Sequence, residues 1–101
     1  MIDKEKLREI AERLKENIPD IEDYSIGIIE HKRKIDYDIY FKLPDRLTRK
    51  EVEDFVNENY DEIYKVVCSN IDCNLFIVKI RPFGTPKYKR GFHVTISETK
   101  V

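Results

Sequence analysis

The chain opens with a stretch in which apolar residues recur every three or four positions, between residues 3 and 18. This stripe consists of Leu7, Ile10, Ala11, Leu14 and Ile18. Such spacing places the apolar side chains on one face of an amphipathic helix. Asp3 is suited to cap the start of the helix, and Pro19 cannot continue it. We therefore predict a helix over residues 3–18.

Two segments with a different period follow. Residues 24–30 are rich in isoleucine, and residues 35–43 alternate strictly between apolar and more polar side chains. The apolar positions of the second segment are Ile35, Tyr37, Ile39, Phe41 and Leu43. Strict alternation predicts a strand with one buried and one solvated face. The polar residues 31–34 between the two segments predict a hairpin turn.

Residues 47–52 contain two sequence signals that mark the start of a second helix. Thr48 and Glu51 form a capping box, in which each side chain bonds the free backbone N–H of the other residue, and Leu47 and Val52 can pack around it as a hydrophobic staple. We predict that this helix ends near residues 69–70. The apolar residues that it should bury are Val52, Phe55, Val56, Ile63, Val66 and Val67.

Two further strands complete the pattern. Residues 73–81 carry apolar side chains on both sides, and residues 92–97 alternate. Moving the last strand to the front of this order would give the ferredoxin-like order. We therefore predict one α+β domain over residues 1–101, an αββαββ two-layer sandwich with two helices on one face of a four-stranded sheet, a circularly permuted ferredoxin-like fold.

The handedness of the crossover makes the second and third strands parallel. The turns at residues 31–34 and 84–90 should then lie at opposite ends of the sheet. Residues on these two turns are therefore not expected to meet.

The amino-acid composition excludes several classes of protein. Lys and Arg number 19 and Asp and Glu number 20, which excludes a uniformly basic nucleic-acid protein and an acidic tail. No apolar run approaches the roughly twenty residues of a membrane span, so we predict no membrane span. Fourteen Ile, one Ala and no Gln are typical of a thermophile or of an AT-rich genome. An opening without an apolar signal region, together with only two cysteines, predicts a cytoplasmic protein in a reducing compartment.

Residues 81–90, here called the basic segment, concentrate positive charge. The segment holds four basic and no acidic side chains, whereas the other 91 residues hold 15 basic and 20 acidic ones. Cations bind phosphates and aromatic rings stack on bases, so the segment is a candidate site for RNA, DNA or another polyanion. Alternatives are an acidic protein partner, the acidic body of a second copy, or a solvated hairpin tip. The candidate binding residues are Arg81, Lys87, Tyr88, Lys89 and Arg90.

For the other residues that could take part in chemistry, we favour structural explanations. Cys68, Cys73 and His31 fall near one end of the predicted sheet, but structural zinc needs four ligands, so we favour buried free thiols and predict no metal and no cofactor. Asp36 and Asp38 share the solvated face of their strand, where Thr95 and Ser97 should lie beside them. Paired carboxylates can hold a cation or share a proton. Alternating strands produce such pairs without any function.

A pattern-level resemblance covers residues 7–82. It rests on a helix ending at residues 18–21, a strand pair, the helix entry at residues 47–52 and a strand ending at residues 78–82. These features resemble the cytoplasmic C-terminal domain of cation diffusion facilitator transporters. In that family the domain dimerises and binds divalent metals through histidines of its second helix and last strand. The matching segments here contain no histidine, so the resemblance implies the αββαβ arrangement and dimerisation but carries over no metal ligand.

These observations predict a small, non-enzymatic, homodimeric binding module. Because both faces of the third strand are apolar, we expect a second copy to cover the solvated face of the sheet near Tyr40, Leu75 and Ile77. The alternatives are nucleic-acid or other polyanion binding through the basic segment, and a stand-alone relative of a metal-transporter regulatory domain.

Overall fold

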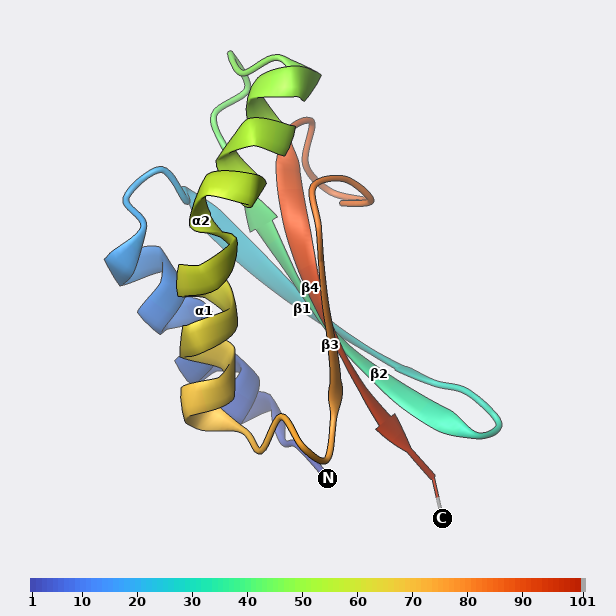
Figure 1. Cartoon of the computed structure of the whole chain (residues 1–101). Helices are drawn as coiled ribbons and strands as arrows, with labels where there is room; N and C mark the ends of the chain where they lie inside the picture. The colour runs from blue at the N-terminus through green and yellow to red at the C-terminus, as the bar shows by residue number, and fades with distance from the viewer. Residues whose placement is uncertain (101) are drawn as a thin grey trace.

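The computed structural model describes residues 1–100 and has the predicted α+β composition, with two helices and four strands (Figure 1). The elements in chain order are α1 (Lys4–Asn17), β1 (Asp23–Glu30), β2 (Lys34–Lys42), α2 (Arg49–Asn70), β3 (Ile77–Arg81) and β4 (Gly91–Thr99).

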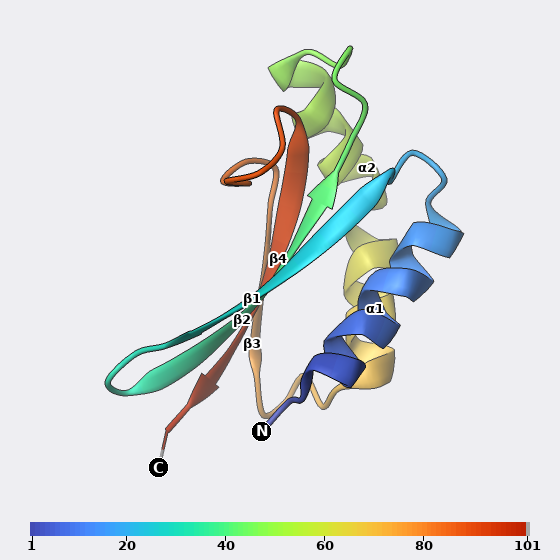
Figure 2. The ribbon, with the colours of Figure 1, turned by 180° about the vertical axis from the view of Figure 1, so that it is seen from behind.

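The strands form one antiparallel sheet in the order β1-β2-β4-β3. Both β2 and β3 run antiparallel to β4, which lies between them, so they share one direction, as predicted. Both helices lie on the same side of the sheet (Figures 1 and 2), and the other side, here called the open face, carries no helix. The turn after β1 and the connection between β3 and β4 lie at opposite ends, also as predicted.

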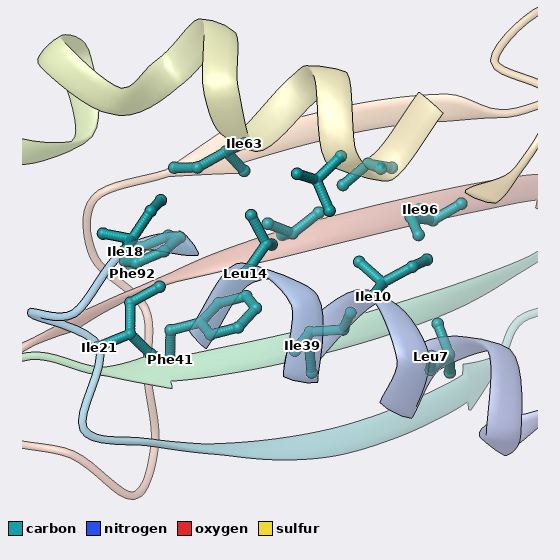
Figure 3. Packing of buried hydrophobic residues seen from close by; sticks show 14 of the residues in the cluster. Leu7, Ile10, Leu14, Ile18, Ile21, Ile39, Phe41, Ile63, Phe92 and Ile96 are labelled. Atoms are coloured by element: carbon teal, nitrogen blue, oxygen red, sulfur yellow. The ribbon is translucent and has the colours of Figure 1, made fainter. Parts of the chain in front are cut away.

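The core lies between the helices and the sheet (Figure 3). Leu7, Ile10 and Leu14 of α1 are fully buried against the sheet. Phe41 of β2 and Phe92 of β4 stack there with 4.8 Å between their ring centroids. Burial of these side chains removes apolar surface from water, which is the main driving force for folding.

The predicted helix ends are confirmed. Asp3 accepts a hydrogen bond from the backbone N–H of Lys6, and α1 ends with Ile18 as its C-cap. At α2, the Thr48 hydroxyl accepts from the Glu51 N–H at 3.1 Å and the Glu51 carboxylate accepts from the Thr48 N–H at 2.9 Å. These bonds satisfy backbone donors that a helix start leaves without partners.

Two predictions near the end of α2 are wrong. Cys68 and Cys73 are not free thiols but form a disulfide, and the third strand begins at Ile77 rather than at residue 73. The backbone N–H of Asn74 donates to the Asp72 carboxylate and that of Leu75 to the Asp72 carbonyl, which makes a turn where the apolar residues of the segment 73–81 predicted a strand. In contrast to the third strand, which is shorter than predicted, β4 is longer than predicted and extends over Gly91–Thr99.

Candidate functional site

A cationic hollow lies between the basic segment and the start of α2. Its volume is about 350 Å³, near the lower limit for small-molecule sites. It is lined by Arg49, Phe83, Gly84, Thr85, Pro86, Tyr88, Lys89, Arg90 and Gly91. The lining contains three cations, two aromatic rings and no carboxylate.

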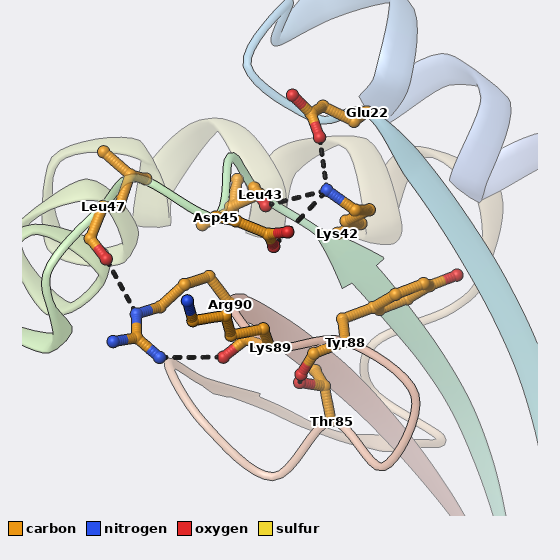
Figure 4. A network of polar contacts seen from close by, with 9 residues as sticks. All are labelled: Glu22, Lys42, Leu43, Asp45, Leu47, Thr85, Tyr88, Lys89 and Arg90. Carbon is orange, nitrogen blue, oxygen red and sulfur yellow. Dashed lines mark hydrogen bonds and ion pairs between the residues drawn. The ribbon is translucent and has the colours of Figure 1, made fainter.

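Arg90 joins the two walls of this hollow (Figure 4). Its Nε donates to the Leu47 carbonyl at 2.7 Å, and its Nη1 donates to the Lys89 carbonyl at 3.0 Å. In addition, the Leu43 N–H donates to the Arg90 carbonyl at 3.0 Å. We predicted Arg90 as a binding residue with a free cation. In the structure it is half-buried, and it holds the basic segment against the entry to α2.

The aromatic residues give the segment its shape. The guanidinium carbon of Arg49 lies 4.4 Å from the centroid of the Phe83 ring, a cation–π arrangement. The Thr85 hydroxyl donates to the Tyr88 carbonyl at 3.1 Å and closes the tip of the segment. Arg49 was not among the predicted binding residues, because only the tertiary fold brings the first turn of α2 beside the segment.

The remaining predicted cations form no ion pair with any residue that the structure describes. Arg81, Lys87 and Lys89 are exposed and form no ion pair within residues 1–100. Close to the hollow, Lys42 pairs with Glu22 and Asp45 (Figure 4). Lys42 therefore offsets part of the negative charge at this end of the molecule.

A second concavity, here called the open-face groove, lies across the middle of the open face. Its volume is about 190 Å³, and its walls are almost entirely polar. It is lined by Lys34, Asp36, Asp38, Tyr40, Lys79, Arg81, Gly84, His93, Thr95 and Ser97. Gly84 lines both concavities, so the basic segment separates them.

The two predicted carboxylates lie in this groove beside the predicted hydroxyls. Thr95 donates to Asp38 and Ser97 donates to Asp36, each at 2.6 Å, which confirms that expectation. The Tyr40 hydroxyl also donates to Asp38, at 3.3 Å. Burial and the adjacent Asp38 carboxylate raise the pKa of Tyr40.

Asp36 has a different electrostatic environment. Its second oxygen lies 3.0 Å from His31 Nε2 and 3.6 Å from Lys34 Nζ. Burial opposes ionisation of Asp36, but the hydrogen bonds from Ser97 and His31 and the charge of Lys34 prevail and lower its pKa. Asp36 is therefore an ionised carboxylate at neutral pH.

His93 is a site residue that sequence reasoning missed. It is only 8% exposed, and its Nδ1 lies 2.6 Å from the Phe83 carbonyl oxygen. A carbonyl accepts only from a protonated nitrogen, so Nδ1 carries the proton and Nε2 keeps its lone pair when the ring is neutral. No described residue bonds Nε2. The one feature of the sequence that could have indicated His93 as a site residue is its position on the polar side of an alternating strand.

The alternative metal set of Cys68, Cys73 and His31 is not brought together. The two sulfurs are bonded to each other, and His31 pairs with Asp36. Within residues 1–100, no three His, Cys, Asp or Glu side chains converge as a metal site.

No protein-family model, curated protein or solved structure matches this chain. The resemblance to the cation diffusion facilitator domain therefore stays a prediction. Neither described helix is both long and apolar enough to cross a membrane.

Proposed function

We propose that this protein is a non-enzymatic binding module whose ligand is a single-stranded nucleic acid, held by the basic segment and the start of α2. The observation that carries the proposal is the cationic hollow, which combines Arg49, Lys89 and Arg90 with two aromatic rings and no carboxylate. Non-specific single-strand sites combine these two features, because cations neutralise the backbone while rings stack on bases.

The charge distribution favours a local contact. The basic segment has a formal charge of +4 on a body of −5, so the body repels a polyanion that approaches elsewhere. The hollow suits a splayed-out base, whereas a duplex keeps its bases stacked and presents mainly phosphates. A single strand therefore uses both the charge and the aromatic surface of the site.

Fluorescence anisotropy with labelled single strands about 12 nucleotides long tests the proposal. If Arg49, Lys87 and Lys89 each neutralise a phosphate, these three contacts should contribute about 2 to the slope of log Kd against log salt. The R49A/K87A/K89A variant should lose this contribution and most of the affinity. The control R13A/K65A removes cations from an exposed region of the two helices and should bind like the original protein.

Absence of binding at about 50 μM protein in low salt, within the usual range of non-specific affinities, would refute the proposal. Equal loss in the control and in the site variant would also refute it, because the affinity would then reflect total charge alone.

Self-association is a second candidate function, and two exposed apolar side chains at the start of β3 and in the turn before it favour it. Leu75 and Ile77 are 72% and 60% exposed beside a strand that pairs on one side only. An unpaired edge can add a strand from another copy. We expect sedimentation to detect a dimer that Ile77→Lys disrupts. A monomer at high micromolar concentration would argue against this candidate.

The centre of the open face is polar, which favours edge pairing over the face-to-face contact expected from the sequence.

The proposed fold relationship is that of a circularly permuted ferredoxin-like domain. If β4 is counted as the first strand, the order β1-β2-β4-β3 becomes 2-3-1-4, with one helix after the first strand and one after the third. This sequence of elements is the ferredoxin-like one and supports the relationship.

A further inference from the structure

The open face carries parallel rows of side chains that run across the sheet. The strand register places Arg81, His93 and Tyr40 in one row and Lys79, Thr95 and Asp38 in the next. Neighbouring rows lie about 6.6 Å apart, since they are two residues apart along each strand. Cations thus lie along the β3 side of the open-face groove, and the Asp38 carboxylate lies on its β2 side.

Tyr40 forms a flat platform beside this groove. Its ring lies across Gly27 of β1, where a Cβ atom would meet Tyr40 Cε2 at 3.5 Å. On its other side, the ring of His93 is 5.8 Å away at an interplanar angle of 36°. Tyr40 is half-buried, which leaves part of its ring accessible to a nucleobase.

The polar groups around the platform are chemically selective. Asp38 accepts from Thr95 and Tyr40, and an ionised carboxylate has lone pairs left for further donors. His93, more than nine-tenths buried, holds an unpartnered Nε2 in the groove lining. The carboxylate oxygens and the Nε2 lone pair of a neutral imidazole are hydrogen-bond acceptors. Lys79 and Arg81 at the rim are exposed donors that form no ion pair with another residue of the range 1–100.

We propose that the open-face groove binds one base of the nucleic-acid strand held by the cationic hollow, and that it selects cytosine. The proposal rests on the function proposed above. The strand crosses the basic segment at Gly84, its phosphates contact Lys79 and Arg81, and the cytosine ring stacks on Tyr40. The exocyclic amino group donates to Asp38, a pairing used elsewhere to read cytosine. Thymine and uracil present a carbonyl oxygen at that position, which the carboxylate repels, and the small groove disfavours purines.

The test compares Kd for oligo-deoxycytidine and oligo-deoxythymidine of equal length by anisotropy. The protein should bind the cytidine strand about ten- to hundredfold more tightly, a difference appropriate to one hydrogen bond to a charged group. Asp38→Asn keeps the shape and should abolish this preference. Tyr40→Ala should weaken binding of both strands about five- to hundredfold. Tyr40→Phe keeps the ring but removes a donor to Asp38, so it should weaken binding much less than Tyr40→Ala.

Matched controls separate stacking from general effects. Tyr60→Ala and Tyr64→Ala remove exposed, mutually stacked rings from α2 and should leave both Kd values unchanged. If Tyr40→Ala fails to fold, K79A/R81A probes the same groove with exposed residues and should weaken both strands.

The outcomes distinguish the two proposals. If R49A/K87A/K89A abolishes binding but Asp38→Asn and K79A/R81A behave like the original protein, the groove proposal is overturned while the proposed function stands. Equal affinity for the two strands overturns the cytosine selection. No binding of either strand overturns both.

Discussion

At the scale of single residues, crowding and hydrogen bonding determine what each position tolerates. Gly84 has a φ of +92°, and a Cβ atom there would lie 2.9 Å from the His93 ring. Gly91 is more restricted still, because a Cβ atom would lie 2.1 Å from the Phe41 carbonyl oxygen. These two glycines allow the basic segment to return to the sheet beside β2.

Gly91→Ala should therefore destabilise the protein by about 2–4 kcal/mol, since backbone rather than a flexible side chain must move. Gly27→Ala is the matched control, because its Cβ atom would make only ordinary contact with Tyr40 at 3.5 Å. Urea denaturation of both variants measures the difference. A Gly91→Ala variant as stable as the control would show that the approach of β4 to β2 is not tight.

Asp36 makes stability depend on pH. The pKa of Asp36 in the folded protein lies below its ordinary value of 3.8. The ionised carboxylate therefore stabilises the fold at pH values above 3.8. This stabilisation is lost as the pH falls through the pKa of the folded protein. Ser97→Ala removes one donor to the carboxylate and should cost about 1–3 kcal/mol at pH 7 and less at pH 3. Melting curves at the two pH values check this, and Ser69→Ala on the exposed surface of α2 is the control.

At the scale of elements, side chains at the ends of α2 connect it to the sheet. At its start, Arg90 of the basic segment bonds the Leu47 carbonyl. At its end, the Cys68–Cys73 disulfide joins the last turn to the chain that leads into β3. The helix is thus tied to the sheet at both ends.

Arg90→Ala should release the basic segment without unfolding the core. We expect trypsin to cleave after Lys87 and Lys89 faster in this variant than in the original protein, with a melting temperature lower by a few degrees. Lys32→Ala, in the exposed turn at the other end of the sheet, should leave this cleavage unchanged. An unchanged rate in Arg90→Ala would mean that the bond to Leu47 does not restrain the segment.

Reduction of the disulfide should lower stability by about 2 kcal/mol, the chain-entropy contribution of a short closed loop. The C68S/C73S variant should fold, should be less stable by a similar amount, and should not respond to reductant. Thermal melts with and without dithiothreitol measure this. Thiol titration of the denatured, unreduced protein should find no free cysteine, and two free thiols would contradict the pairing.

At the scale of the whole molecule, one apolar layer between the helices and the sheet provides most of the stability. Leu14 is fully buried there, whereas Leu75 is 72% exposed. The same substitution at these two leucines therefore isolates the contribution of burial.

Leu14→Ala should cost about 2–5 kcal/mol, and Leu75→Ala should change the stability of the monomer by less than about 0.5 kcal/mol. Denaturation at several protein concentrations checks both values. A concentration-dependent loss in Leu75→Ala alone would instead support self-association at the β3 edge.

The local pattern of the sequence determined the helices, their caps and most strands, because these depend on neighbours within a few positions. The capping box of Thr48 and Glu51 is one example. The alternation that puts Asp36 and Asp38 on one face of their strand, and Thr95 and Ser97 on one face of theirs, is another. In each case, spacing along the chain specifies which face or which backbone group a side chain meets.

Only the tertiary structure decided which distant residues meet. It placed Arg49 over Phe83, bonded Arg90 to Leu47, and directed His93 Nδ1 to the Phe83 carbonyl. It also paired Cys68 with Cys73, although these residues lie close in sequence, because the distance between two sulfurs depends on how the chain turns after α2. Periodicity describes which side of an element is apolar, whereas these contacts depend on the path of the chain between elements, and no local pattern encodes that path.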